Sequence, residues 1–155
     1  YTMQDGTEAV SCWRGDGIGL RKLDRLGIAK MVISSEPNCV VAARCQKMGI
    51  ECRHSVENKL ELLEQLAREM QIGLEQIAFV GNDINDLPCL KAVGLPIAVH
   101  DSHPHVVADA RYVTTADGGQ GAVREVCDLL EWAHGWMEAS PLAGAGTAQS
   151  DSAVM

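Results

Sequence analysis

The sequence predicts an α/β domain in which helices cover both faces of a mainly parallel β-sheet, a Rossmann-like three-layer sandwich. Short apolar runs alternate with amphipathic segments of helical period through the body of the chain. The runs end at glycine or polar residues, which favours buried parallel strands. The 155 residues suffice for one domain with a hydrophobic core, expected at residues 1–138, and the Ala-, Gly- and Ser-rich residues 139–155 are expected to be a disordered tail.

The composition narrows the class of protein. A formal net charge of −8 argues against nucleic acid or an anionic membrane as a partner. No apolar run reaches membrane-spanning length, and no signal peptide is recognisable. The six cysteines form no Cys-x-x-Cys pair and no zinc-binding spacing. A cytoplasmic protein with reduced cysteines is therefore expected.

The chain opens with a hairpin signal, Asp5-Gly6 between two runs of extended character that reach Trp13. The glycine-rich stretch Arg14–Gly19 follows, and it is weak evidence for a nucleotide loop because the strand before it is not buried. We expect a flexible turn there, then a helix over about Ile18–Leu26 that ends at Gly27. Its inward face is expected to carry Ile18, Leu20, Leu23 and Leu26.

Ile28–Ile33 is the next predicted strand, and Ser34 and Ser35 lie at its carboxyl end. A hydroxyl at such a position can hydrogen-bond a phosphate oxygen. The commoner role is a helix cap, for which Ser35 and Asn38 are both candidates. The residues alone leave both roles open.

Two helices and a short strand come next. A helix over about Cys39–Met48 is followed by a strand at Glu51–His54 and by a strongly amphipathic helix over about Lys59–Gln71. Lys59 lies in the first turn of that helix, where the positive end of the helix dipole disfavours a cation. A residue that breaks a local rule is a candidate functional residue. The apolar face of the helix is expected to carry Leu60, Leu63, Leu66, Ala67 and Met70.

The apolar run Ile77–Val80 predicts a buried strand, and a polar loop follows it at once. Ligands of open parallel sheets bind just beyond the carboxyl ends of the strands, so Asn82, Asp83 and Asp86 are expected to face a site. Carboxylates grouped in this way suit a hard cation such as Mg²⁺. The alternative is an acidic loop that only caps the next helix through Asn85 or Asp86.

The remaining elements complete the alternation. A short helix over Asp86–Ala92 precedes a strand at Leu95–Val99, and Pro96 near its start indicates an edge position. Arg111–Thr114 is a last short strand, and Ala122 to about Trp132 is the closing helix. Three histidines before that strand indicate a loop and a helix start rather than a zinc site: His100, His103 and His105.

Ser34, Lys59 and the Gly81–Asp86 loop, each after a strand or at a helix start, resemble motifs two, three and four of the haloacid dehalogenase superfamily. The likeness covers about Tyr1–His134. It extends to the capless 3-deoxy-D-manno-octulosonate 8-phosphate phosphatase family, which includes the phosphatase-like domain of many CMP-sialic acid synthetases (N-acylneuraminate cytidylyltransferases). The stretches that carry this closer likeness are Arg14–Gly19, Val80–Leu90, Ala98–Pro104, Tyr112–Thr115 and Gly118–Glu125.

The resemblance implies a Mg²⁺-dependent phosphomonoesterase for an acidic eight- or nine-carbon sugar phosphate, either 3-deoxy-D-manno-octulosonate 8-phosphate or a sialic acid 9-phosphate. It also implies that one aspartate attacks phosphorus and that a second, two residues on, protonates the leaving sugar. Ser34 would bind the phosphoryl group and Lys59 would neutralise its charge. The implied magnesium ligands are Asn82, Asp83 and Asp86.

Two departures from the family pattern bear on activity. The Asp-x-Asp motif of the first strand does not occur in the sequence; that strand is expected upstream of Tyr1. Neither Asp5 nor Asp16 follows a buried strand, so neither is a convincing substitute. The usual Gly-Asp-Asp loop has the neutral Asn82 in place of a carboxylate, which should weaken Mg²⁺ binding.

Two functions therefore stay open, the phosphatase and a non-catalytic oligomerisation domain associated with a CMP-sialic acid synthetase. A homotetramer is expected, because an exposed hairpin face with Val10, Cys12 and Trp13 needs a partner. Neighbouring subunits would then close the active site. Substrate contacts are expected from Arg14, Asp16, Gly17, Ser35 and Arg124.

Overall fold

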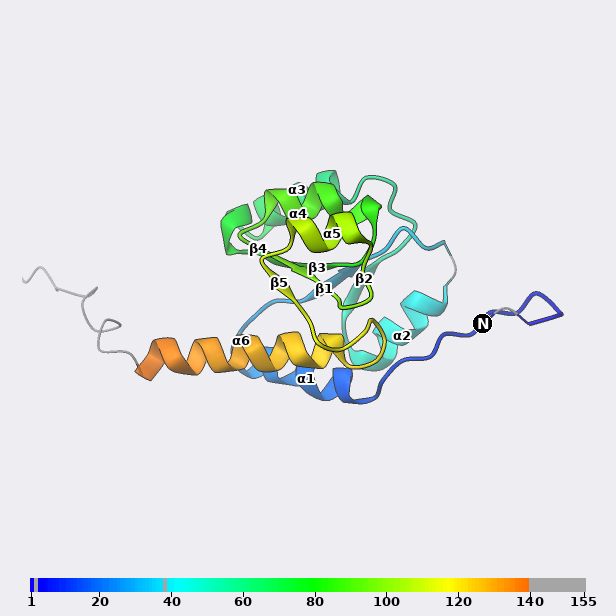
Figure 1. The fold of residues 1–155 in the computed structure, drawn as a ribbon, viewed down its shortest axis with the longest axis horizontal. Helices are drawn as coiled ribbons and strands as arrows, with labels where there is room; N and C mark the ends of the chain where they lie inside the picture. The colour runs from blue at the N-terminus through cyan, green and yellow to red at the C-terminus, as the bar shows by residue number, and fades with distance from the viewer. Residues whose placement is uncertain (2, 38, 140–155) are drawn as a thin grey trace, which may run out of the picture.

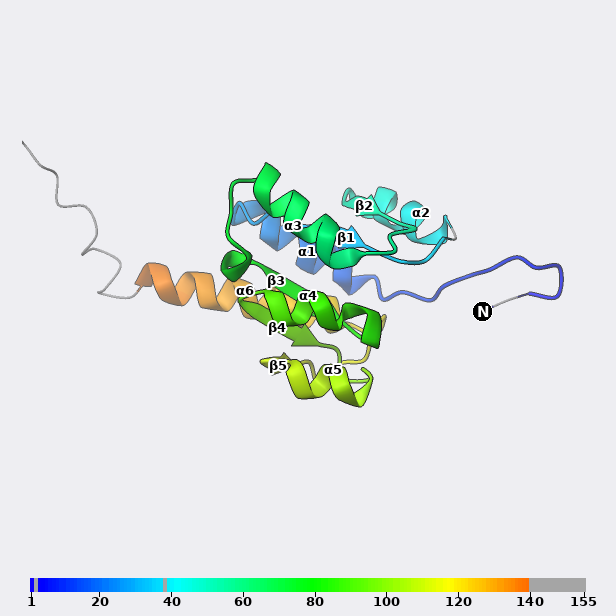
Figure 2. The ribbon, with the colours of Figure 1, turned by 90° about the horizontal axis from the view of Figure 1, so that it is seen from above.

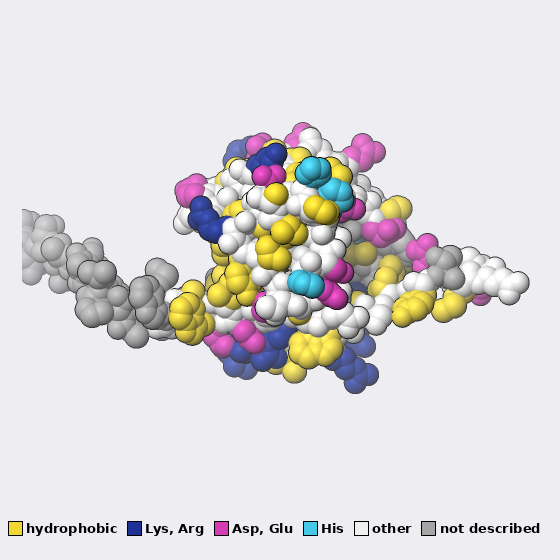
Figure 3. All heavy atoms as spheres, viewed as in Figure 1, with side chains coloured by type: hydrophobic (Ala, Val, Ile, Leu, Met, Phe, Trp, Pro, Cys, Tyr) yellow, Lys and Arg dark blue, Asp and Glu magenta, His cyan; other side chains and the backbone are white. Residues whose placement is uncertain are grey.

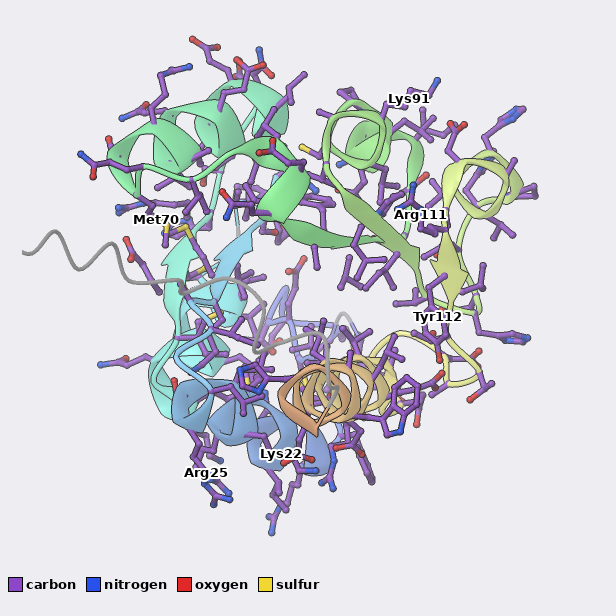
Figure 4. The ribbon with its side chains drawn as sticks, turned by 90° about the vertical axis from the view of Figure 1, so that its left-hand side faces the viewer. Lys22, Arg25, Met70, Lys91, Arg111 and Tyr112 are labelled. Carbon is purple, nitrogen blue, oxygen red and sulfur yellow. The ribbon has the colours of Figure 1, made fainter. Side chains whose placement is uncertain are left out.

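Short strands and the helices between them form the predicted three layers in the computed structural model, which describes residues 1, 3–37 and 39–139. In Figures 1 and 4, α3, α4 and α5 cover one face of the strands, and α1, α2 and α6 cover the other. The α/β class is confirmed. The elements are α1 Gly15–Arg25, β1 Met31–Ile33, α2 Val40–Met48, β2 Glu51–Arg53, α3 Lys59–Glu69, η1 Leu74–Gln76, β3 Ala78–Gly81, η2 Ile84–Asp86, α4 Leu87–Ala92, β4 Leu95–Ala98, α5 Pro104–Asp109, β5 Tyr112–Val113 and α6 Ala122–Ala139.

The strands form two parallel sheets rather than one. β1 pairs with β2, and β4 pairs with β3 on one side and β5 on the other. Seen from above in Figure 2, the strands follow the order β2, β1, β3, β4, β5, so β1 and β3 are the edges that face each other. Within the described part of the chain, β1 and β3 each have a hydrogen-bonded neighbour on one side only.

Two expectations about the strands are wrong, because the order of the strands differs from the one expected. The strand at Ile77–Val80 was expected to be buried, yet Val80 is 37% exposed, because β3 has only one paired edge. Pro96 was expected at a sheet edge, yet β4 is the middle strand, and its residues Ile97 and Ala98 are 0% exposed. Pro96 is the second residue of β4, where the hydrogen-bond ladder loses a single donor.

The core on the α3–α5 side consists of two clusters that share Phe79 of β3. One cluster contains Leu63, Cys89 and Val93, and the other contains Leu90, Ala98 and Val106. Phe79 packs against both, so β3 joins the helices of this layer although its outer edge is unpaired.

On the opposite face, α1 and α6 pack closely. A Cβ at Gly19 would lie 2.9 Å from Arg124 Cδ and 3.0 Å from Cys127 Cβ, so a larger residue there would push the helices apart. Lys22 of α1 also pairs with Asp128 at 2.7 Å. The α1 helix begins earlier than expected, at Gly15, and Ile18 is 49% exposed rather than inward.

Some of the predicted helix caps are present in the structure and others are not. Asn58 caps α3 by accepting a hydrogen bond from the Glu61 backbone at 3.2 Å, and Gly49 ends α2 with φ of +68°. Ser35 does not cap α2, because Cys39 occupies the N-cap position without a side-chain hydrogen bond; Asn38 lies outside the described residues. Met70 is 47% exposed, since α3 ends at Glu69.

The N-terminal turn forms as predicted, but the long second strand does not. Tyr1 and Ala9 exchange backbone hydrogen bonds of 2.8 and 2.9 Å around the turn. Trp13 instead donates its backbone N–H to the Gly119 carbonyl at 3.0 Å, which ties this segment to the loop before α6. Residues 140–155 of the predicted tail lie outside the described residues.

All six cysteines are free thiols. Burial raises the pKa of Cys45, Cys89 and Cys127 to about 11 each, so these three behave as small apolar residues. His103 caps α5 by accepting from the His105 backbone at 3.2 Å, which confirms a loop and helix start in the histidine segment. None of the helices in the described ranges is both long and apolar enough to cross a bilayer.

Glu125 of α6 fastens the segment after β5. Its carboxylate accepts hydrogen bonds from the Tyr112 hydroxyl at 2.7 Å, the Thr115 backbone at 2.9 Å and the Ala116 backbone at 3.0 Å. In Figure 4, Tyr112 is labelled on the side of the strands that faces α6. Burial acts to raise the pKa of Glu125, but these hydrogen bonds outweigh burial and hold the pKa below its usual value of 4.5.

Replacing Glu125 by glutamine is expected to destabilise the fold by about 2 kcal/mol at neutral pH. A carboxyl whose folded-state pKa is lowered stabilises the fold above its unfolded pKa, and this stability is lost as pH falls through the folded pKa. The difference in melting temperature between wild type and variant should therefore shrink below pH 4.5, the usual value. A difference that stays constant in acid, or an equal effect in the exposed Glu57→Gln control, would contradict this assignment.

Candidate active site

Lys59 opens α3 and reaches a carboxylate from another part of the chain. Its Nζ lies 2.7 Å from Asp86 Oδ1, and the two side chains are only 10% and 4% exposed. A cation in the first turn of a helix opposes the helix dipole. Asp86 compensates that cost, so the unfavourable position of Lys59 has a structural reason.

Asp86 also fixes the loop that follows β3. Its second oxygen, Oδ2, accepts the Asn82 backbone N–H at 2.9 Å and the Asp83 backbone N–H at 3.3 Å. A Cβ at Gly81 would lie 2.7 Å from Asp86 Cβ, so the loop closes this tightly only around glycine. Both oxygens of Asp86 are thus engaged, which makes Asp86 the support of Lys59 and of the loop.

The oxygens left for a cation come from Asn82 and Asp83, which are both exposed. Asp83 Oδ1 caps η2 by accepting from the Ile84 backbone at 2.7 Å, and the described contacts leave its other oxygen unused. Within the described residues, no three or more His, Cys, Asp or Glu side chains are grouped to hold a metal ion. The donor set of one amide and one carboxylate nevertheless suits Mg²⁺, which keeps several waters.

Two serines follow β1, and one of them contacts this loop. Ser34 Oγ accepts the Glu36 backbone N–H at 3.1 Å, and Ser35 Oγ accepts from the Asn85 side-chain amide at 3.0 Å. Each hydroxyl is an acceptor in its bond, so its own proton can be donated to another group. Asn85 thereby joins the ends of β1 and β3. The sequence indicated Asn85 only as a candidate helix cap, but Asp86 occupies the N-cap position of α4, without a side-chain cap hydrogen bond.

The other predicted substrate residues lie apart from this cluster in the described contacts. Asp16 is buried and accepts the Arg124 backbone N–H at 3.1 Å; burial raises the pKa of Asp16, and the Arg124 hydrogen bond and the nearby Arg44 charge partly offset this effect. Arg124 Nε donates to both oxygens of Asp128, at 2.8 and 2.9 Å. Arg14 and Gly17 line an open pocket beside α1.

The fold and the site together define a class of protein. A parallel α/β sandwich carries serines, a buried lysine–aspartate pair and an acidic loop at the carboxyl ends of its strands. Residues 22–126 match the haloacid dehalogenase-like hydrolases. The chain belongs to this family and, within it, to the group of the 3-deoxy-D-manno-octulosonate 8-phosphate phosphatases.

Similar proteins and solved structures support membership of this phosphatase group. The 3-deoxy-D-manno-octulosonate 8-phosphate phosphatase of Escherichia coli strain K12 is 37% identical over 89% of this chain and 74% of the relative. The Moraxella catarrhalis phosphatase of the same name, solved with magnesium, phosphate and the sugar, is 32% identical with a TM-score of 0.83, over 90% of this chain and 80% of that one. A proposed HAD family hydrolase from Streptomyces avermitilis is 44% identical with a TM-score of 0.80, over 83% and 74% of the two chains.

Proposed function

We propose that this chain forms the phosphatase domain of a Mg²⁺-dependent, cytoplasmic phosphomonoesterase for an acidic sugar phosphate, 3-deoxy-D-manno-octulosonate 8-phosphate or a sialic acid 9-phosphate. The observation that carries the proposal is the buried Lys59–Asp86 pair, 2.7 Å apart, at the same edge of the strands as Ser34. A fixed cation and a hydroxyl group at the same edge of the strands suit a phosphoryl group, whose oxygens carry the charge to be stabilised.

Each residue of the candidate site has a separate proposed role in binding the phosphoryl group or the metal. Lys59 is held in one position by Asp86, so its charge is placed before the substrate arrives. Ser34 can donate its hydroxyl proton to a phosphoryl oxygen while it accepts from the Glu36 backbone. Asn82 and Asp83 would hold Mg²⁺, which when bound neutralises phosphoryl charge.

The nucleophile is proposed to lie on a strand between β1 and β3. The sequence contains no Asp-x-Asp motif, and the facing edges of these two strands have no partner among the described residues. The carboxyl ends of β1 and β3 carry Ser34 and Asn82, so a parallel strand between them would end beside both. An aspartate at its end would then lie near Lys59.

Phosphate release from the two candidate sugar phosphates tests the function. The full natural protein with Mg²⁺ should release phosphate from at least one of them, and chelation of the metal should stop the reaction. Lys91→Ala should release phosphate at the wild-type rate, because Lys91 forms only a surface ion pair, with Asp109 at 3.4 Å. Release from neither compound by the folded protein would exclude this function.

The second candidate is a non-catalytic oligomerisation domain associated with a CMP-sialic acid synthetase. Asn82 favours it, because a neutral amide stands where the family commonly has a carboxylate. In either case we propose a homotetramer that uses the N-terminal face, where Val10 is 54% and Trp13 is 47% exposed. Light scattering on the protein used in the assay measures this assembly, and a tetramer without phosphatase activity would favour the second candidate.

A further inference from the structure

Three of the six cysteines line one open cavity between α2 and β2. Cys39 is the N-cap of α2, Cys45 lies within α2, and Cys52 lies in β2. The cavity has a volume of about 590 Å³, and the rest of its wall consists of Ala42, Ala43, Gln46 and Ile50. Figure 3 shows charged side chains along the upper rim and the α1 edge of the molecule, whereas none of the described residues that line this cavity is charged. The thiols are therefore its reactive groups.

The side chains of Cys45 and Cys52 are in direct contact. The Cys45 thiol donates a hydrogen bond to the Cys52 sulfur, from helix to strand. The backbone keeps the two residues together, because Gly49 ends α2 in a left-handed turn and Ile50 then donates its N–H to the Cys45 carbonyl at 3.0 Å. This contact brings the sulfur atoms near the separation of about 2.05 Å that a disulfide requires.

The two thiols differ in their access to solvent. Cys45 is 2% exposed, whereas Cys52 is half-buried. Burial raises the pKa of Cys45 to about 11, and the Cys52 thiol beside it adds to the increase. Cys45 therefore keeps its proton at neutral pH and is unreactive alone. A solute that enters the cavity reaches Cys52 first.

Cys39 shares the cavity but stands outside this pair. Its thiol is exposed, and it precedes the first turn of α2. In the part of the chain that the structure describes, no three His, Cys, Asp or Glu side chains are grouped to hold a metal ion. The three thiols thus do not form one metal site, and the arrangement suits a bond between the two that touch.

We propose that Cys45 and Cys52 form a reversible disulfide when the protein meets a peroxide. The Cys52 sulfur attacks one oxygen of hydrogen peroxide, the O–O bond breaks, and one water leaves, so that Cys52 becomes a sulfenic acid. The Cys45 sulfur then attacks the Cys52 sulfur, the S–OH bond breaks, and the hydroxyl leaves as a second water with the Cys45 proton. Two thiols are oxidised and one peroxide is reduced. The uncharged wall of the cavity favours such a small neutral oxidant.

The bond would fasten the strand that supports Ser34. Among the described residues, β2 pairs with β1 alone. The carbonyl of Arg53, the residue after Cys52, accepts the Ser34 backbone N–H at 2.8 Å. A bond from Cys52 to α2 restrains the opening of β2, so this hydrogen bond should break less often. The modification therefore acts on the anchor of Ser34, whether or not the domain is a phosphatase.

Oxidation of the full natural protein with hydrogen peroxide, followed by blocking of the remaining thiols and peptide mapping by mass spectrometry, tests the proposal. Trypsin cleaves after Lys47, between the two cysteines, so the disulfide should join two peptides of the wild type until dithiothreitol separates them. Cys45→Ser and the less buried Cys52→Ser should both lose the joined peptides. The control Cys39→Ser should form them in wild-type yield. Circular dichroism before oxidation checks that each variant is folded.

Hydrogen exchange gives a second measurement. The Ser34 amide should exchange about tenfold more slowly in the oxidised wild type than in the reduced one, and treatment of Cys52→Ser should leave its exchange unchanged. Four results would overturn the proposal: no joined peptides in the wild type, a bond from Cys39 instead, oxidation of Cys52 to a sulfinic acid without a bond, or equal exchange of the Ser34 amide in both forms.

Discussion

Lys59→Ala should lower the free energy of unfolding by about 3 kcal/mol, because it leaves a charged carboxylate buried without its partner. Asp86 is only 4% exposed, so water cannot readily replace the lost ammonium group. The same carboxylate accepts the backbone N–H groups of Asn82 and Asp83, so the loop should also lose order when Lys59 is removed. Chemical denaturation monitored by circular dichroism measures the change.

Lys91→Ala is the matched control for this prediction. It also removes a lysine from an ion pair, but the pair with Asp109 spans 3.4 Å at the surface, with side chains 63% and 37% exposed. A loss below about 1 kcal/mol is expected there. The double variant Lys59→Ala/Asp86→Ala should be less unstable than the sum of its single variants, because each single change removes the same pair. Equal losses in Lys59→Ala and Lys91→Ala would show that the buried pair contributes little.

Activity should respond even more strongly than stability. If the domain is a phosphatase, Lys59→Ala should reduce the rate of phosphate release about 100- to 1000-fold, the usual effect of removing one fixed group that stabilises transition-state charge. Assays must therefore be run below the melting temperature of the variant, so that unfolding does not imitate a catalytic defect.

Addition of Mg²⁺ should raise the melting temperature of the wild type, and Asp83→Ala should abolish the increase. A ligand that binds only the folded state stabilises it by about 2.7 kcal/mol at a concentration of 100 times its dissociation constant. Asp83 is exposed and its one described contact caps η2, so its replacement should cost only about 1 kcal/mol without metal. Thermal melting with and without millimolar Mg²⁺ measures both effects.

Two further variants show which carboxylates the Mg²⁺-dependent increase in melting temperature requires. Asp109→Ala removes a surface carboxylate of α5 and should keep the full Mg²⁺ effect. Asp86→Ala should melt earlier in the absence of metal and also lose the effect, because the backbones of Asn82 and Asp83 lose their acceptor. Equal increases in Asp83→Ala and Asp109→Ala would indicate non-specific screening. A wild type without any increase would indicate that the loop is a helix cap or that the metal requires a ligand from a further strand.

At the candidate site, the sequence indicated residues but not the contacts between them. Lys59 was identified because it breaks the dipole rule at a helix start, and the structure places it against Asp86. Asn82, Asp83 and Asp86 were expected together as magnesium ligands, with no distinction between them. The structure favours Asp83, since hydrogen bonds occupy both oxygens of Asp86. Such occupancy depends on the path of the loop in space, which residue spacing does not reveal.

The errors in the fold have a common physical origin. Burial of β3 and the edge position of Pro96 were inferred from local composition, but sheet order decides both, and sheet order is a long-range property. The sequence singled out Arg14 as a substrate contact but missed the cations around it, for the same reason. Arg14 and Arg21 come from one segment of the chain and Arg44 and Lys47 from another, and only the packing of α1 and α2 brings their charges together.

The open edges of β1 and β3 have a consequence for handling the protein. Each edge presents backbone donors and acceptors with no partner in the described part of the chain, and Val80 adds apolar surface beside them. Unpaired parallel edges are templates onto which extended segments of other molecules can add, which is a route to aggregation. A strand between β1 and β3, as proposed for the nucleophile, would therefore also protect the domain from self-association, so solubility and catalytic competence should be gained or lost together.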